Sequence, residues 1–162
     1  MLYEAPYATV YIDPLVPSTG KRAFWRWADR HSTGRRVVVL TTIRFHRRSR
    51  DELIARYGAS SSPAKSALPQ GVQSVMLRGA GETLFWLAEP RTLVVGDRII
   101  GGGGGLELCP ESWLRYLPSR LTADGLRELL RPLLELPIER VLVSHGEPVL
   151  ADGARALARA LE

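Results

Sequence analysis

Two short apolar runs in this sequence each end at a side chain that could do chemistry. Residues 93–95 lead through a glycine to Asp97, and residues 141–143 lead through Ser144 to His145, which a glycine follows. Carboxylate and imidazole groups bind divalent metals and transfer protons. The ends of strands are where α/β proteins usually build their sites. Each residue alone is equally typical of a turn, but together they predict a functional site.

A third candidate is His46, which follows the apolar run 37–40 and is surrounded by basic residues. Arginine recurs at positions 35, 36, 44, 47, 48 and 50. The segment is compatible with a metal-binding loop, an anion-binding loop or an ordinary solvated surface. The sequence alone leaves these three interpretations open.

The glycine run Gly101–Gly105 is a further unusual segment. Five consecutive glycines lose much conformational entropy when they are ordered, so the run predicts a mobile loop at the rim of the site unless other contacts hold it. It lacks the Lys-Ser/Thr pair of a phosphate-binding loop, which argues against a nucleotide site.

Length and composition describe an ordinary globular chain. It has 162 residues, of which 45% are hydrophobic and 24% charged, and these values predict one domain over residues 1–162. No apolar run reaches the length of a membrane span, and no basic segment followed by an apolar stretch opens the chain. With the single Cys109, this favours a cytoplasmic protein with no membrane partner. The net charge of +5 comes mostly from arginine. This balance indicates either dispersed surface charge or a preference for acidic ligands.

Strand-like and helix-like segments alternate along the chain. Strands are predicted at residues 8–12, 37–42, 72–77, 83–87, 92–95 and 141–143. Helices are predicted at residues 23–31, 51–57, 112–117, 151–161 and, after the N-cap Thr122, along the leucines 126, 129, 130, 133 and 134. Trp25 falls beside the apolar stripe of its helix and is expected to be exposed. This order predicts an α/β domain of packed helix and sheet layers.

Several of these segments resemble the metallo-β-lactamase-fold hydrolases. The resemblance is specific at residues 93–100 and 141–149, and it extends to residues 11–14, 37–42 and 81–87. It implies a four-layer αβ/βα sandwich with its site at strand ends between two sheets. The chain is short for that family, so we expect trimming at the N-terminus.

The metal-binding signature of that family, His-x-His-x-Asp-His after a threonine, is broken here. If Thr42 is matched to the threonine, the four ligand positions hold Ile43, Phe45, Arg47 and Arg48. His46 is then out of step by one, and a shift that corrects it leaves Arg44, Arg48 and Ser49 at the other positions. No histidine lies between His46 and His145, so the intermediate histidine of the family is missing as well.

These replacements argue against a dinuclear site. A guanidinium has no lone pair to offer and stays protonated, so it neither binds a cation nor tolerates one nearby. The favoured expectation is therefore no cofactor, with Arg44, Arg47 or Arg48 replacing the metal charge, one of them pairing with Asp97 and the others binding a small anion or phosphate. A single zinc or other divalent metal on His46, Asp97 and His145, with water as the fourth ligand, is the alternative.

Three functions follow, in this order. The first is a hydrolase-like protein with a degraded metal site, with little or no dinuclear hydrolysis and with a small anion as its ligand. The second is an active mononuclear hydrolase of a phosphoester or thioester. The third is a nucleic-acid-binding module, ranked last because no aromatic residues alternate with the basic ones. A homodimer is compatible with the sequence, which does not show one.

Overall fold

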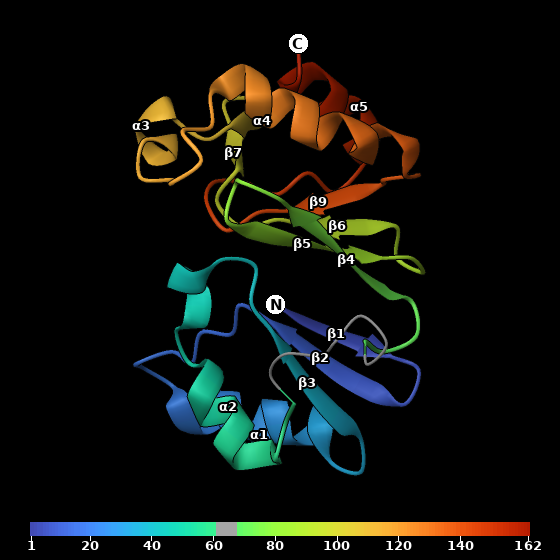
Figure 1. Cartoon of the computed structure of the whole chain (residues 1–162). Coiled ribbons are helices and arrows are strands. Elements are labelled where there is room, and N and C mark those ends of the chain that lie inside the picture. The colour runs from blue at the N-terminus through green and yellow to red at the C-terminus, as the bar shows by residue number, and fades with distance from the viewer. Residues whose placement is uncertain (61–67) are drawn as a thin grey trace. The chain divides into compact units, whose positions relative to one another are not determined.

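The computed structural model describes residues 1–60 and 68–162 and divides the chain into two compact units, Met1–Val72 and Gln73–Glu162 (Figure 1). Each unit contains a sheet and helices. Residues 60–70 form a polar, proline-containing connection in the sequence, and most of them lie outside the described residues. The assignment of residues 1–162 to a single domain stays a prediction.

The first unit contains a three-stranded sheet in the order β1-β2-β3. Strands β1 (Leu2–Ala5) and β2 (Ala8–Ile12) form an antiparallel hairpin that turns at Tyr7, whose φ is 65°. Strand β3 (Arg36–Leu40) pairs parallel to β2. A parallel neighbour requires a crossover connection, and the helix between β2 and β3 supplies it.

Two helices pack on one face of this sheet. Helix α1 (Lys21–Ser32) makes the crossover, and a short 3₁₀ helix, η1 (Arg44–Arg47), precedes α2 (Arg50–Tyr57). Helix α2 ends at Gly58, whose φ of 59° is the left-handed conformation of a helix C-terminus. The buried core of this unit consists of Tyr11, Val16, Ala28, Val37, Val39 and Leu53.

The second unit contains a four-stranded sheet in the order β4-β5-β6-β9. Strands β4 (Val72–Leu77), β5 (Glu82–Leu87) and β6 (Thr92–Val94) follow one another along the chain, and β9 (Arg140–Leu142) joins the far side of β6. The β5–β6 pair is antiparallel, whereas β6 and β9 are parallel.

The glycine run forms part of a β-hairpin, so the prediction of a loop was wrong, and the contacts that were the stated exception to its mobility are present. Strands β7 (Ile99–Gly102) and β8 (Gly105–Leu108) pair antiparallel from Ile99 and Leu108 to Gly102 and Gly105. The ordering cost of these glycines is offset by ladder hydrogen bonds and by contacts to other segments of the unit. Those contacts could not be inferred from the run itself.

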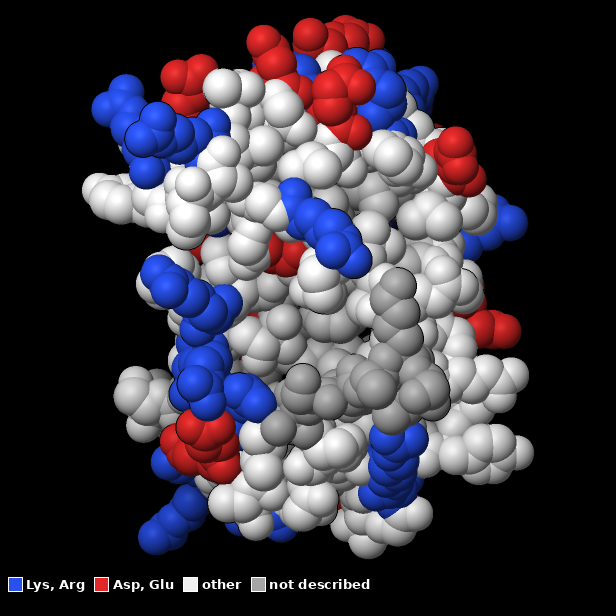
Figure 2. Space-filling view, viewed as in Figure 1, with Lys and Arg blue, Asp and Glu red and all other residues white. Residues whose placement is uncertain are grey.

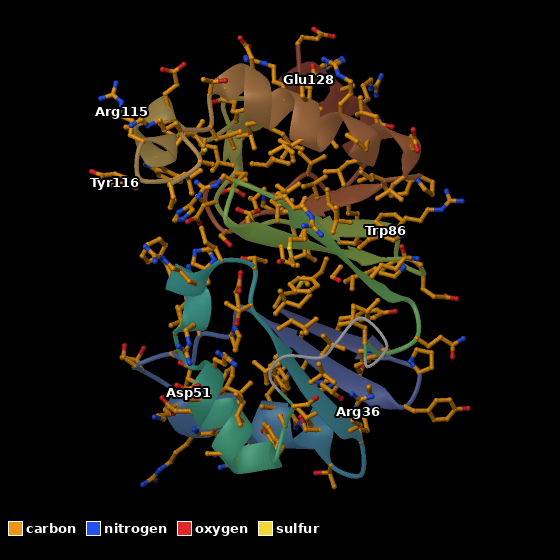
Figure 3. The ribbon with its side chains drawn as sticks, viewed as in Figure 1. Arg36, Asp51, Trp86, Arg115, Tyr116 and Glu128 are labelled. Carbon is orange, nitrogen blue, oxygen red and sulfur yellow. The ribbon has the colours of Figure 1, made fainter. Side chains whose placement is uncertain are left out.

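The helices of the second unit cover its sheet. They are α3 (Glu111–Leu114), α4 (Ala123–Leu130), the 3₁₀ helix η3 (Arg131–Glu135) and α5 (Gly153–Ala160). The Thr122 side chain accepts a hydrogen bond from the Gly125 amide, which confirms the predicted N-cap. The leucine stripe packs inward, while Glu128 lies on the outer side of α4 (Figure 3).

The predicted strands and helices agree with the structure except at a few places. The sequence did not predict β1 or the β7–β8 hairpin. The exposure expected for Trp25 was wrong, because this ring packs against the core of the first unit and Arg56 stacks over it at 4.7 Å. Among the described residues, no helix is long and apolar enough to span a membrane.

Leu157 on α5 tests the core of the second unit. It is fully buried, so Leu157→Ala should lower the free energy of unfolding by about 2–5 kcal/mol through lost contacts and a residual cavity. Leu150 is 62% exposed, and Leu150→Ala should change that free energy by less than about 0.5 kcal/mol. Equal losses in chemical denaturation would contradict the core described above.

Candidate metal site

The parallel pairing of β6 and β9 brings Asp97 and His145 together. In that ladder Val94 lies opposite Leu142, and each functional residue follows its strand partner by three positions. Parallel strands end at the same edge of a sheet, so equal offsets place both side chains at that edge. The distance between Asp97 Oδ1 and His145 Nε2 is 3.2 Å. The structure thus brings together the two residues that the sequence singled out first.

A buried carboxylate holds the turn that carries Asp97. Glu82, at the start of β5, is 3% exposed. Its Oε1 accepts a hydrogen bond from the Gly96 amide at 2.8 Å, and its Oε2 accepts from the amides of Asp97 at 2.8 Å and Arg98 at 3.0 Å. Three successive backbone donors on one carboxylate fix the direction in which the Asp97 side chain leaves the chain.

The surroundings of Glu82 have two opposing effects on the ionisation of its carboxyl group. Burial raises the pKa of its carboxyl, while the three amides and the nearby positive charge of Arg98 act in the opposite direction. Arg98 is itself buried, and its Nε donates to the Ala80 carbonyl at 2.9 Å. Buried charges require hydrogen bonds and a compensating charge. Both side chains are hydrogen-bonded here, and the positive charge of Arg98 acts on the Glu82 carboxylate.

The turn that carries His145 is held by a backbone contact with β7. The Gly101 amide donates to the His145 carbonyl at 2.8 Å. A β-carbon at Gly101 would lie 2.1 Å from the Glu147 carbonyl oxygen, and one at Gly146 would lie 2.1 Å from the Gly101 carbonyl oxygen. Both positions therefore require glycine, and Gly146 also has a φ of +78°. The glycine-rich hairpin supports the site directly.

His145 is the more accessible member of the pair. Its side chain is 46% exposed, compared with 15% for Asp97. The ring of Trp113, on α3, meets the imidazole edge-to-face with centroids 5.3 Å apart. This contact restricts the ring on one side, so helix α3 also contributes to the orientation of His145.

His46 lies in the first unit, where it forms a buried cluster with Asp13 and Thr42. Its Nδ1 is 3.0 Å from Asp13 Oδ2, and the Thr42 amide donates to Asp13 Oδ1 at 2.8 Å. The Thr42 hydroxyl donates to the same carboxylate. An imidazole that donates from Nδ1 to a carboxylate presents the Nε2 lone pair, which is the usual state of a metal-binding histidine.

The arginines near His46 lie on the surface. Arg44, Arg47 and Arg48 are exposed, and in the space-filling view basic side chains gather over η1 and the start of α2 (Figure 2). Arg44 stacks over Phe45 at 4.5 Å, and Arg47 lies 4.0 Å from Asp51 on α2 (Figure 3). Their predicted role in anion binding and the predicted pairing of one of them with Asp97 stay predictions.

The fold of the chain has known structural counterparts. It is similar to TTHA1623 in a di-iron-bound form, with 19% identity, a TM-score of 0.66, and coverage of 99% of this chain and 91% of that one. It is also similar to the metallo-β-lactamase DIM-1, solved after exposure to ceftazidime, and to VMB-1, solved at pH 5.5. Both are 11% identical over 99% of this chain, with TM-scores of 0.62 and 0.61 and coverage of 82% and 81% of their own lengths.

These similarities confirm the predicted fold. No family model matches the chain, and no curated protein does. The chain nevertheless has the metallo-β-lactamase fold, to which the strand ends at Asp97 and His145 pointed. Identities this low establish the architecture alone.

Two supporting residues were not recognised in the sequence. Glu82 is a charged residue that opens an otherwise apolar strand, and Asp13 directly follows an apolar strand, with a φ of 46°. These were the available signals: a charge beside a buried strand must find partners. Which amides or rings would supply those partners depends on contacts between segments distant in the sequence.

The distance between Asp97 and His145 matches both a direct hydrogen bond and two ligands on one metal ion. Two ligand atoms bound to a tetrahedral ion at about 2.1 Å are about 3.4 Å apart. The 3.2 Å between Asp97 Oδ1 and His145 Nε2 agrees with this value. The residues present therefore fit a divalent metal, and the same pair could alternatively exchange a proton as an acid and a base.

Gly101→Ala tests the backbone contact behind His145. The new β-carbon would overlap the Glu147 backbone, so we expect a loss of about 1–3 kcal/mol in the free energy of unfolding and a shift of the His145 ring resonances in NMR spectra. Gly103→Ala is the matched control, because a β-carbon there meets nothing within 4 Å. Unchanged His145 resonances in Gly101→Ala would show that the hairpin does not position this side chain.

Proposed function

We propose that this protein binds a single divalent metal ion through His46, Asp97 and His145 and that it is a mononuclear metal-dependent hydrolase of anionic esters. The observation that carries the proposal is the 3.2 Å distance between Asp97 Oδ1 and His145 Nε2. Glu82 supports this arrangement by accepting a hydrogen bond from the Asp97 amide. A carboxylate and two imidazoles with one open position are a catalytic zinc arrangement.

His46 is proposed as the third ligand because its chemistry suits that role. Its Nδ1 contact with Asp13 at 3.0 Å favours the tautomer whose Nε2 can bind a cation. A metal-binding histidine usually has such a carboxylate partner. In the resemblance to the metallo-β-lactamase fold, His46 also belongs to the loop that carries the first metal ligands.

A second metal ion is not proposed. TTHA1623, which has the same fold, was solved with two irons bound. In this chain, Arg47 and Arg48 occupy the positions that match two of the ligands in the family signature, and guanidinium groups neither donate electron pairs nor tolerate a nearby dication. The proposed metal count is therefore one.

The chemistry that a bound metal would supply is a water of lowered pKa at neutral pH. The residues of the chain then have defined tasks. Asp97 supplies the negative charge of the ligand set, and His145, the more exposed ligand, borders the open side. The exposed guanidiniums of Arg44, Arg47 and Arg48 would attract an anionic substrate such as a phosphoester.

Metal titration in solution tests the proposed site. Wild-type protein should bind one equivalent of Co²⁺ with visible d–d absorption, and calorimetry with Zn²⁺ should give the same stoichiometry. His46→Ala, Asp97→Ala and His145→Ala should each weaken binding by more than the roughly 10–100-fold expected for the loss of a supporting contact.

His31→Ala is the matched control for the histidine variants. His31 is the remaining histidine, and its ring contacts Glu4 at 3.2 Å on the surface of the first unit. This variant should bind the metal as wild-type does. Two equivalents per chain, or undiminished binding in Asp97→Ala, would refute the proposed site.

Hydrolysis is tested with the metal-loaded protein. Generic ester and phosphodiester substrates should be cleaved faster with added Zn²⁺ or Mn²⁺, and Asp97→Ala should abolish the gain. If the protein binds one metal and cleaves none of these substrates, the proposed hydrolase activity is refuted. That result would favour the hydrolase-like protein with a degraded metal site, which is the first of the three functions predicted from the sequence.

Anion binding is the second candidate function, because Arg44, Arg47 and Arg48 are exposed on one short segment. Removing all three charges should abolish phosphate binding measured by calorimetry. The matched control removes three exposed arginines of α1: Arg22, Arg26 and Arg30. If both triple variants lose phosphate binding equally, the binding comes from general surface charge and not from a site at Arg44, Arg47 and Arg48.

A further inference from the structure

We infer that Glu82 is the positioning residue of the metal site: its carboxylate gathers the amides of residues 96–98 and thereby aims the Asp97 side chain at the cation. The inference rests on the proposed function, since it gives Asp97 the role of a ligand. Glu82 itself does not touch the metal or the substrate.

Three consecutive amides donate to one carboxylate over 2.8, 2.8 and 3.0 Å, using both of its oxygens. A turn in which three successive amides have a fixed direction has little remaining freedom in its backbone. The Asp97 side chain, between the first and third of these donors, therefore has its starting direction set before any ligand arrives.

Successive amides that point to one side form a concave surface of positive partial charge that attracts anions. If these amides faced the metal, they would repel it and compete for the Asp97 carboxylate. Glu82 accepts their hydrogen bonds on the buried side of the turn, so their positive ends point at Glu82.

A glutamine at position 82 has one accepting oxygen and two donating hydrogens, so it cannot accept from three amides at once. At least one amide would face a donor. Only a carboxylate satisfies this turn, although a buried charge requires compensation, which buried Arg98 contributes.

Glu82→Gln tests the inference, with Glu89→Gln as the matched control. Both changes replace a glutamate of the β5–β6 segment by its amide, but Glu89 is exposed at the turn beyond β5. In metal-free protein, Glu82→Gln should increase amide hydrogen exchange at residues 96–98. It should leave the amide of Val95, which donates to the Leu142 carbonyl at 3.0 Å, protected.

The same variants are then titrated with Co²⁺. We expect Glu82→Gln to weaken binding by roughly 10–100-fold and to alter the d–d spectrum, as the loss of a supporting carboxylate does elsewhere. Glu89→Gln should match wild-type in affinity and spectrum. Wild-type affinity in folded Glu82→Gln would overturn the inference.

The two proposals can fail separately. If wild-type protein binds no Co²⁺, the proposed function fails, and the exchange rates at residues 96–98 still decide whether Glu82 orders the turn. If Glu82→Gln does not fold, scalar couplings across the hydrogen bonds from these amides to the Glu82 carboxylate can be measured in wild-type protein. Detectable couplings support the inference, and their absence at all three amides overturns it.

Discussion

The parallel alignment of β6 and β9 is the constraint on which the site depends. Because Val94 is opposite Leu142, equal extensions of three residues bring Asp97 and His145 to the same edge of the sheet. Sheet pairing alone does not orient side chains, however. Glu82 accepts hydrogen bonds from the turn that carries Asp97, and Gly101 donates to the carbonyl of His145. With both turns fixed in this way, Asp97 Oδ1 and His145 Nε2 lie 3.2 Å apart.

Asp97 and His145 lie on turns whose backbones are fixed by contacts within the second unit. The positions that do not match the family signature lie elsewhere: residues 43, 45, 47 and 48 follow Thr42, and no histidine lies between His46 and His145. His46 has a comparable support, since Asp13 holds its Nδ1. Buried hydrogen bonds of this kind are costly to break, so they preserve the local geometry of a turn.

The sequence predicted the features that depend on local pattern. Apolar runs located most strands, Thr122 marked the start of a helix, and the strand-end residues Asp97 and His145 are in contact as expected. It failed where distant segments decide the outcome. The glycine run forms a hairpin whose Gly101 packs against residues 145–147, and Trp25 is partly buried, with Arg56 stacked over its ring. Neither Glu82 nor Asp13 could be assigned a role without knowing which amides and rings lie beside it.

The central claim is that the Asp97–His145 pair is one side of a single-metal site. Anomalous diffraction at the zinc absorption edge, from crystals grown with Zn²⁺, tests it most directly. The account predicts one anomalous peak per chain, bound by Asp97 Oδ1 and His145 Nε2 with His46 as the third protein ligand. A fully occupied second peak beside the first, or no peak at this pair while zinc binds elsewhere on the chain, would contradict it.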